Sequence, residues 1–452
     1  MRVHILGIAG TFMAGIAVLA KQLGHDVSGS DANIYPPMST QLAQQGIKLT
    51  EGFDLSIFDP MPDAIIVGNA MKRGNPCIEY LLNNMVPLIS GPKWLAEHIL
   101  QGRWVLAVAG THGKTTTTSM LTWILEYAGF KPNFLIGGVP ENFGVSARFT
   151  GSDFFVIEAD EYDTAFFDKR AKFIHYHPRT LILNNLEFDH ADIYQSLAEI
   201  QRQVQYLLRT IAADGKIIAP KDDLHVAEVL QQECWTPVEY FALEQAANWS
   251  VKNLTADASC FEVYHNEAQQ GVAQWSLLGA HNVRNALAAI AAAYQVGVPV
   301  KTALAALTTF KNVKRRLELR GVTAHNIAVY DDFAHHPTAI QATIQALRGK
   351  VQQKRMIAIL ECGSYTMRTG VHQNTLADSL QGADFAYILR PKQADWDLEQ
   401  KMHHAAIPVH IFAEVDEIVQ ALAKEAKPGD QILVMSNSGF AGIHQKLLDT
   451  LP

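Results

Sequence analysis

Cysteine is scarce in this chain of 452 residues. Its four cysteines, Cys77, Cys234, Cys260 and Cys362, lie far apart, and no Cys-x-x-Cys pair occurs. That spacing excludes a zinc knuckle and predicts no disulfide framework. We therefore expect the protein to work in a reducing compartment.

Long apolar runs are also lacking. The segment 3–20 is apolar, as the core of a signal peptide would be, but Gly7, Gly10 and Gly15 interrupt it and no small-residue cleavage site follows. We interpret it as a strand, a glycine turn and a helix. No other stretch reaches the roughly 18 consecutive apolar residues of a transmembrane helix. We expect a cytoplasmic protein without membrane insertion.

An excess of positive charge is absent as well. The chain has 37 lysines and arginines against 45 aspartates and glutamates, which gives a net charge of −8. A nucleic-acid-binding surface needs a broad basic face, so this composition predicts none. The hydrophobic content of 48% is typical of globular domains. At roughly 150 residues per domain, the length predicts about three domains.

What the chain does have is a repeated alternation of short apolar runs with helical stretches. Runs such as 64–67, 104–109 and 356–360 carry almost no polar residues. Strands of this kind are buried on both faces, so they predict an α/β fold with parallel sheets covered by helices. Shorter alternating runs at 250–254, 260–265 and 272–278 predict a small antiparallel sheet attached to the second unit.

The strongest local motif is the segment 110–116, Gly-Thr-His-Gly-Lys-Thr-Thr, which lies between a predicted buried strand and a predicted helix. Such a loop offers backbone N–H groups and a helix N-terminus to phosphate. Lys114 would reach the β- and γ-phosphates, and the Thr115 hydroxyl would ligate Mg²⁺. The loop is shorter than the usual motif, because Ala107 stands where that motif has glycine. The alternative is a glycine turn with a chance lysine.

Three further polar clusters occur in the same unit. An acidic cluster, 158–161, and an asparagine-rich cluster, 184–190, each follow a predicted strand, and a third cluster, 279–285, opens a helix. Carboxylates suit Mg²⁺, His190 is a candidate ligand of a second metal, and the asparagines suit a purine edge. The alternatives are a solvated acidic turn, a structural histidine and helix capping by asparagine.

The third unit adds a basic triplet, 314–316, and the segment 331–337 at the end of a predicted strand. An arginine from a neighbouring domain can stabilise the charge of a γ-phosphate during transfer. Asp332 could accept hydrogen bonds from ribose hydroxyls. A basic triplet is also typical of a solvated surface.

The order of these motifs resembles that of the Mur ligases, which are ATP-dependent amide-bond ligases of bacterial peptidoglycan metabolism. The resemblance covers essentially the whole chain and includes GTHGKTTTT, EADEYD, NNLEFDHADIY, GAHNVRN, KRRLE and DDFAHHPT. It implies a Rossmann-like UDP-sugar domain at 1–101, a central P-loop ATPase domain at 102–312 and a Rossmann-like domain for the incoming amine at 313–452.

Two members of this family join their amine to UDP-N-acetylmuramate. One adds L-alanine, and the other adds the recycled tripeptide L-alanyl-γ-D-glutamyl-meso-diaminopimelate. The stretches 29–39, 68–76 and 436–448 resemble the tripeptide-adding member. This implies an ADP-forming ligase that passes through an acyl phosphate on the lactyl carboxylate, with the alanine-adding activity as the alternative. The implied substrates are small molecules, and no obligate protein partner is indicated.

The resemblance also implies roles for the matching residues. Catalysis would involve Lys114, His190 and Arg316, and Mg²⁺ would be held by Thr115, Glu158 and His190. The residues implied for ATP are Gly110, Thr111, His112, Gly113, Lys114, Thr115, Thr116, Asn282, Arg316, Asp332, His335 and His336. The residues assigned to the other substrates are Gly10, Thr11, Asp31, Asn69 and Arg368.

Two positions depart from the family pattern. Many Mur ligases carry a carbamylated lysine about 15 residues after the motif histidine, where this chain has Gln205, although the two muramate-adding members share that absence. In the segment 360–368, Cys362, Gly363 and Tyr365 replace the Pro, Arg and Asn of the tripeptide-adding member. Arg368 keeps a basic group at the end of that segment and is our candidate for gripping the peptide.

Two other classes of function stay open at this point. A nicotinamide oxidoreductase would use the glycine turn that begins at Gly7, but only the first of three expected glycines of a dinucleotide fingerprint is in place. A nucleotide-binding switch without ligase activity is the other alternative.

Overall fold

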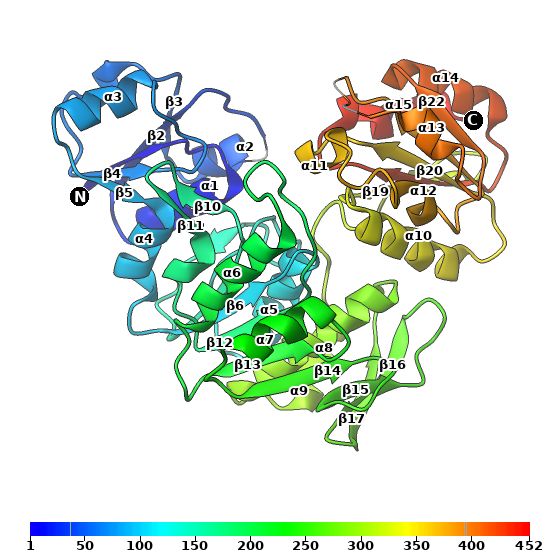
Figure 1. Cartoon of the computed structure of the whole chain (residues 1–452), viewed down its shortest axis with the longest axis horizontal. Coiled ribbons are helices and arrows are strands. Elements are labelled where there is room, and N and C mark those ends of the chain that lie inside the picture. Colours follow the sequence, from blue (N-terminus) through cyan, green and yellow to red (C-terminus); the bar gives the residue numbers. More distant parts are fainter. Residues whose placement is uncertain (37, 393, 395) are drawn as a thin grey trace.

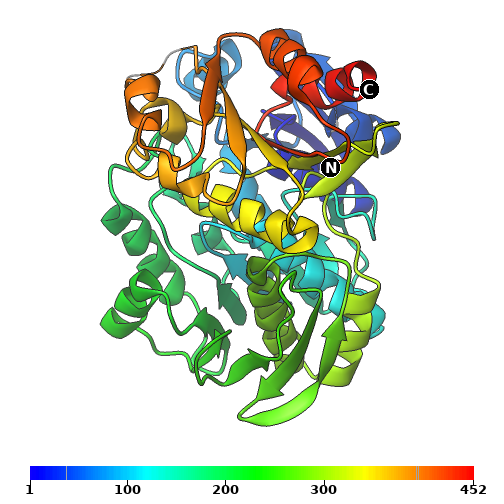
Figure 2. The same cartoon turned by 90° about the vertical axis from the view of Figure 1, so that its right-hand side faces the viewer.

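The computed structural model describes residues 1–36, 38–392, 394 and 396–452 of the chain. Its elements form three lobes, each built around one large sheet (Figure 1). The N-terminal and C-terminal lobes lie on opposite sides above the central lobe in Figure 1, and Figure 2 shows the C-terminal lobe above the central one from the side. The α/β fold with three domains is therefore confirmed.

The N-terminal lobe contains a parallel five-stranded sheet with the strand order β3-β2-β1-β4-β5. Its central strand β1 is buried from Val3 to Leu6, as its apolar sequence predicts. The chain leaves β1 toward β2 on one side and β4 on the other, and such a switch point opens a crevice at the carboxyl end of the strand. The elements are β1 (Arg2–Leu6), α1 (Thr11–Gln22), β2 (Asp26–Asp31), α2 (Met38–Gln44), β3 (Lys48–Glu51), η1 (Leu55–Phe58), β4 (Ala64–Val67), α3 (Pro76–Asn83), β5 (Leu88–Ser90), α4 (Gly91–Leu95) and η2 (Ala96–Leu100).

The central lobe contains a ten-stranded sheet in the order β17-β16-β15-β14-β13-β12-β6-β9-β7-β8. Strand β6 lies between β12 and β9 and is parallel to both, so the carboxyl ends of these three strands meet at one edge. The elements are β6 (Trp104–Ala109), α5 (Lys114–Tyr127), β7 (Asn133–Leu135), β8 (Ala147–Arg148), β9 (Phe154–Glu158), the separate hairpin β10 (Asp163–Ala165) and β11 (Asp168–Ala171), η3 (Lys172–His175), β12 (Thr180–Leu183), α6 (Leu197–Leu208), β13 (Lys216–Pro220), α7 (Leu224–Gln232), β14 (Val238–Ala242), β15 (Trp249–Lys252), β16 (Cys260–His265), β17 (Ala268–Gln274), α8 (Ala280–Gln295) and α9 (Val300–Thr308).

The antiparallel strands of this lobe differ from the prediction in two respects. They continue the central sheet, because β15 pairs in parallel with β14, and so they do not form a separate sheet. The predicted strand at 272–278 is instead β17, which begins earlier, at Ala268. A tight turn at Asn266 and Glu267, both with positive φ, starts the return strand there. Asn-Glu is a weaker hairpin signal than Asn-Gly, which explains why the predicted strand began too late in the sequence.

The C-terminal lobe contains a six-stranded sheet in the order β18-β19-β23-β20-β21-β22. All its pairings are parallel except that of the edge strand β18. The elements are β18 (Glu318–Val322), β19 (Ala328–Asp332), α10 (Pro337–Val351), β20 (Met356–Glu361), α11 (Tyr365–Arg368), α12 (Leu376–Ser379), β21 (Phe385–Leu389), α13 (Leu398–Met402), β22 (Val409–Phe412), α14 (Val415–Glu425), β23 (Gln431–Met435), η4 (Phe440–Gly442) and α15 (Ile443–Thr450).

The predicted domain limits, at residues 101/102 and 312/313, fall between elements of different sheets and stay a prediction. Within the described residues, no helix combines the length and apolarity needed to cross a membrane. The four cysteines are free thiols.

Candidate active site

The phosphate loop lies where the sequence places it, between the carboxyl end of β6 and the N-terminus of α5. Gly110 and Gly113 both adopt positive φ, at 135° and 78°. A Cβ atom on Gly113 would lie 2.5 Å from Oδ1 of Asn285, so this position requires glycine. The loop is tied down by the backbone N–H of His112, which donates to Oδ1 of Asn185 at 2.7 Å. The backbone N–H groups that open α5 are thus held ready for an anion.

The side chain of Lys114 is 11% exposed and lies at the centre of an ionic cluster. Its Nζ donates to the Gly110 carbonyl at 2.8 Å and to Oε2 of Glu161 at 2.7 Å, and it lies 3.8 Å from Oδ1 of Asp160. Burial alone would lower the pKa of Lys114, but the carboxylates of Glu161 and Asp160 raise it above its usual value. The lysine is therefore a permanent cation at the mouth of the loop.

Thr115 and Glu158 also lie together. The Thr115 hydroxyl donates to Oε1 of Glu158 at 2.9 Å, and the Gly137 backbone N–H donates to Oε2 at 2.7 Å. Burial raises the pKa of Glu158, while Lys114 opposes the rise. A hydroxyl and a carboxylate oxygen beside a phosphate loop are the hard donors that Mg²⁺ prefers.

His190 completes the cluster from the loop after β12. Its Nε2 lies 3.0 Å from Oε1 of Glu161, and its backbone has a positive φ of 57°. Burial lowers the pKa of His190, but the opposing effect of Glu161 is larger, so the pKa lies above its ordinary value. One donor atom each of Asp160, Glu161 and His190 lies within 4.8 Å of the other two, so the three side chains could ligate a cation.

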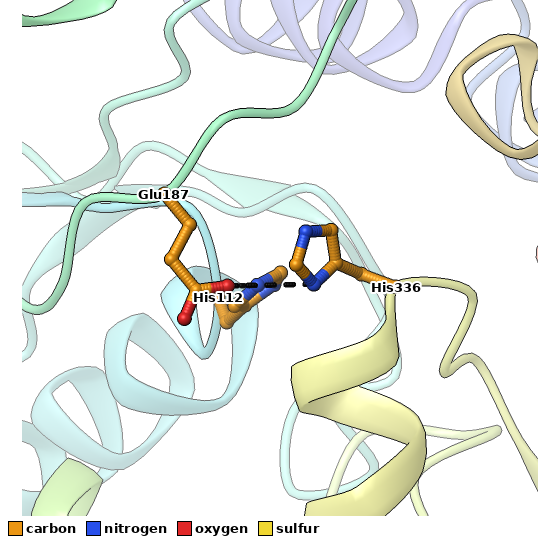
Figure 3. Close-up of side chains that lie close together, drawn as sticks. All are labelled: His112, Glu187 and His336. Atoms are coloured by element: carbon orange, nitrogen blue, oxygen red, sulfur yellow. Dashed lines mark hydrogen bonds and ion pairs between the residues drawn. The ribbon is translucent and has the colours of Figure 1, made fainter. Parts of the chain in front are cut away.

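A second group joins the central lobe to the C-terminal lobe (Figure 3). Nε2 of His112 lies 3.1 Å from Oε2 of Glu187, and Nδ1 of His336 lies 3.4 Å from the same oxygen. The Thr338 hydroxyl donates to that oxygen at 2.8 Å. Burial, with His112 nearby, lowers the pKa of His336 to about 3. Burial would raise the pKa of Glu187, but its hydrogen bonds from His112 and Thr338 lower it to about 2. Glu187 is therefore an anion that links the two lobes at the phosphate loop.

The asparagines of α8 and β12 lie behind the loop. Nδ2 of Asn184 donates to Oδ1 of Asn285 at 2.8 Å. Asn282 is buried, and its Nδ2 donates to the Leu278 carbonyl at 2.8 Å. It does not cap α8, because the N-cap of that helix is Gly279 and no side chain accepts a capping hydrogen bond there. Thr111 exchanges hydrogen bonds with the backbone of Glu187. Thr116 is buried in the first turn of α5.

The predicted nucleotide residues of the C-terminal lobe cluster around the end of β19. Asp332 accepts hydrogen bonds from the backbone N–H groups of Leu317 and Ala334 at 2.7 and 2.8 Å, and burial raises its pKa. The Arg316 guanidinium lies 5.1 Å from the centre of the Phe333 ring. Nδ1 of His335 lies 2.9 Å from the Phe333 carbonyl. Among the described residues, no hydrogen bond or ion pair joins the Arg316 side chain to the phosphate loop.

The predicted sugar-binding residues gather at the carboxyl end of β1. Gly10 caps helix α1, which begins at Thr11. Oδ2 of Asp31 accepts a hydrogen bond from the Ala9 backbone N–H at 2.9 Å, which fixes the glycine turn. Asn69 follows β4, the parallel neighbour of β1, at the same edge of the sheet. These residues therefore surround one helix N-terminus.

The segment that departs from the family pattern faces the loop of His190. The Thr366 hydroxyl donates to Oδ1 of Asp189 at 3.0 Å and accepts from the Ala191 backbone N–H at 3.4 Å. Arg368 ends the same short helix, α11, and its buried Nε has no hydrogen-bond partner among the described residues. Gln205 points elsewhere, toward Gln232 on α7. The position at which many Mur ligases carry a carbamylated lysine therefore holds an amide side chain instead.

Three residues of this site were not predicted from the sequence. Glu161 was treated as part of an acidic turn, although it is the direct partner of both Lys114 and His190. Glu187 lies in the motif NNLEFDHADIY, but only the placement of the C-terminal lobe shows that it links two lobes. Lys172 is buried and pairs with Asp160 at 3.2 Å. Lys172 stands 12 positions after Asp160 and belongs to no motif that would have revealed it.

Comparisons with known proteins agree with this arrangement. Three family descriptions match the chain: "Mur ligase family, catalytic domain" over residues 2–103, "Mur ligase middle domain" over 108–293 and "Mur ligase, glutamate ligase domain" over 315–438. The UDP-N-acetylmuramate–L-alanyl-γ-D-glutamyl-meso-2,6-diaminoheptandioate ligase of Escherichia coli K12 is 56% identical over 100% of this chain and 98% of its own length. The chain belongs to the Mur ligase family.

Two further relatives place it within the family. A crystal structure of a murein peptide ligase from Psychrobacter arcticus is 46% identical, with a TM-score of 0.76 over 100% of this chain and 98% of that one. The UDP-N-acetylmuramate–L-alanine ligase of Caldanaerobacter subterraneus is 29% identical over 99% of this chain and 97% of its own length. As a Mur ligase the protein is an enzyme, and a full-length match of this kind gives no support to a nicotinamide oxidoreductase.

Proposed function

We propose that this Mur ligase joins UDP-N-acetylmuramate to the tripeptide L-alanyl-γ-D-glutamyl-meso-diaminopimelate, with ATP converted to ADP and phosphate. The observation that carries the proposal is the phosphate loop of the central lobe, where Lys114 donates to Glu161 and where His112 shares Glu187 with Thr338 of the C-terminal lobe. The name of the relative with 56% identity supports the tripeptide, while the alanine ligase is only 29% identical.

The chemistry needs activation, because a carboxylate and an amine do not form an amide spontaneously in water. An oxygen of the lactyl carboxylate attacks the γ-phosphorus, and the bond to the β-phosphate oxygen breaks to release ADP. The neutral alanyl amine then attacks the carbonyl carbon of the acyl phosphate, phosphate leaves and the amine loses one proton. Lys114 and Arg316 would stabilise charge on the transferred group, so catalysis would be positioning and electrostatics.

The donors present fit Mg²⁺. Thr115 and Glu158 supply oxygen atoms, and their mutual hydrogen bond could be exchanged for a shared cation. His190 would supply a nitrogen ligand once its Nε2 released Oε1 of Glu161. Bound Mg²⁺ would neutralise phosphate charge. A carbamylated lysine has no place in this scheme, because Gln205 occupies that position.

The other roles follow from the resemblance and the placement of the residues. Within the nucleotide site, we assign Asn282 to adenine and Asp332 to ribose. We place His335 and His336 near the nucleotide. The residues proposed to hold the phosphates are Gly110, Thr111, His112, Gly113, Lys114, Thr115 and Thr116. The residues assigned to UDP-N-acetylmuramate are Gly10, Thr11, Asp31 and Asn69, and Arg368 is assigned to the peptide. The domain limits 1–101, 102–312 and 313–452 and a bacterial cytoplasmic location belong to the same proposal.

The test measures phosphate release by the purified enzyme with ATP, Mg²⁺ and UDP-N-acetylmuramate. The amine is varied among L-alanine, the dipeptide, the tripeptide and a tetrapeptide. We expect the tripeptide to be used far better than L-alanine. Comparable rates with L-alanine would favour the alanine-adding activity, and phosphate release that needs no amine would contradict a ligase.

A further inference from the structure

Lys172 is a buried cation whose role the family motifs do not explain. It begins the short helix η3, just after the hairpin of β10 and β11, and its side chain is only 8% exposed. Helix η3 packs against α4 of the N-terminal lobe. Lys172 therefore lies in the seam between the nucleotide-sugar lobe and the central lobe.

The ammonium of Lys172 has few partners for a group so deeply buried. Its Nζ donates to Oδ2 of Asp160 at 3.2 Å, and this is its one hydrogen-bond acceptor among the described residues. An ammonium has three N–H donors, and a buried polar group without partners is costly. The remaining neighbours are two aromatic rings, Tyr162 at 5.5 Å and Phe12 at 5.2 Å from the ring centres. Two unused donors in a buried seam point to a ligand that accepts hydrogen bonds there.

The position of Lys172 connects the two substrate sites. Phe12 is the second residue of α1, directly after the Gly10–Thr11 turn that we assign to the UDP-sugar. On the other side, Asp160 lies within 4 Å of both Lys172 and Lys114, at 3.2 and 3.8 Å. Contacts through Phe12, Lys172 and Asp160 therefore connect the turn that we assign to the UDP-sugar with Lys114 of the phosphate loop.

We propose that the Lys172 ammonium binds the carboxylate of the nucleotide-sugar acid and holds it beside Lys114 for phosphoryl transfer. The inference rests on the proposed function, because it assigns a residue to the acid that function requires. A carboxylate would accept the unused N–H donors, and the burial of the seam would strengthen the resulting charge-assisted hydrogen bonds. Lys172 would also separate the substrate carboxylate from the like charge of Asp160 and thereby prevent repulsion.

The experiment compares two nucleotide sugars that differ in the lactyl group. Titration calorimetry gives the Kd of UDP-N-acetylmuramate and of UDP-N-acetylglucosamine, which lacks the lactyl carboxylate, for the wild type and for Lys172→Met. We expect the variant to bind UDP-N-acetylmuramate at least about tenfold more weakly, the loss typical of a hydrogen bond to a charged group. Its Kd for UDP-N-acetylglucosamine should change by less than about twofold.

Lys169→Met is the matched control, because Lys169 lies on strand β11, directly before η3, but its side chain is 69% exposed. It should leave both Kd values unchanged. If Lys172→Met does not fold, Lys172→Gln replaces it with the same expectation. Equal weakening of both sugars would show a structural role and overturn the inference, and so would unchanged affinity for both.

The outcomes separate this inference from the proposed function. A wild type that binds neither UDP-sugar and releases no phosphate contradicts the proposed function. A wild type that ligates normally, with a Lys172→Met variant that keeps the full preference for UDP-N-acetylmuramate, overturns the role of Lys172 alone.

Discussion

The two outer lobes are attached to the central lobe in different ways. Buried apolar residues of the N-terminal lobe, such as Ile16 and Trp94, belong to one continuous cluster with Ala107 and Leu181 of the central sheet. The C-terminal lobe keeps its own clusters on the two faces of its sheet. Apart from the segment 309–317, which connects the two lobes, the side chains of this lobe that form hydrogen bonds with the central lobe, among the described residues, are Thr338 and Thr366.

This difference has a functional meaning. A continuous apolar core holds two lobes rigidly, whereas a few polar contacts allow one domain to move on another. The nucleotide-sugar site and the phosphate loop are therefore a fixed pair. We expect the C-terminal lobe to close on them through contacts at Glu187 and Asp189, which lie in the same loop as His190. Substitutions in the fixed pair should affect the chemical step, and those in the moving lobe should affect use of the peptide.

The largest effect is expected from Lys114→Ala in the fixed pair. Removal of the cation leaves the transferred phosphoryl group uncompensated, and turnover should fall by roughly 10³ or more. Steady-state phosphate release measures the loss. The Kd of UDP-N-acetylmuramate should stay within about twofold, because Lys114 serves the triphosphate. Near-normal turnover would refute the assignment of the phosphate loop.

Arg368→Ala tests the moving lobe. If Arg368 holds a carboxylate of the tripeptide, the KM for tripeptide should rise about tenfold, while the KM for ATP stays unchanged. Initial rates with each substrate varied in turn give both constants. Arg390→Ala is the control, because Arg390 lies in the same lobe but pairs with Glu399 on the surface. An equal rise in both constants would remove Arg368 from the peptide site.

A smaller effect is expected at the contact between the lobes. Thr366→Val keeps the shape of the side chain but removes the hydroxyl that donates to Asp189. We expect kcat/KM for tripeptide to fall by roughly threefold to tenfold, as for one hydrogen bond. Thr369→Val is the matched control, because within the described part of the chain the Thr369 hydroxyl donates only to carbonyls of its own helix turn. If both variants behaved alike, the contact would have no part in closure.

The smallest effect concerns pH and Glu187. Its pKa is lowered to about 2, so this carboxylate stabilises the folded state above its ordinary pKa near 4.5, and the contribution is lost as the pH falls toward 2. Glu187→Gln should therefore have a lower Tm than the wild type at pH 6, and the difference should shrink at pH 3. Thermal unfolding at the two values measures it. A constant difference would show that the charge of Glu187 is not what joins the lobes.

The sequence was informative where local pattern determines structure. Apolar runs identified β6, β9 and β12, and parallel strands bring their carboxyl ends together, so the meeting of Lys114, Glu158 and His190 was predictable. The sequence did not predict that Glu161 is the partner of Lys114. Glu161 reaches Lys114 because of the path that the loop after β9 takes, and no sequence pattern indicates that path.

Contacts between lobes were the part that the sequence did not predict. Glu187 and Thr338 are 151 positions apart, and Lys172 meets Phe12 across a seam between two sheets. No periodicity or spacing encodes such pairs, because they depend on how whole lobes pack. The motif order nevertheless identified the family, since the residues that we assign to phosphate lie on loops whose positions the strands fix.

The central claim is that the phosphate loop activates a carboxylate held by the N-terminal side of the molecule. The most direct measurement uses UDP-N-acetylmuramate labelled with ¹⁸O in the lactyl carboxylate, together with ATP and tripeptide. Attack of that carboxylate on the γ-phosphorus predicts that each phosphate released carries one ¹⁸O atom from the carboxylate. Unlabelled phosphate released in step with amide formation would contradict the account.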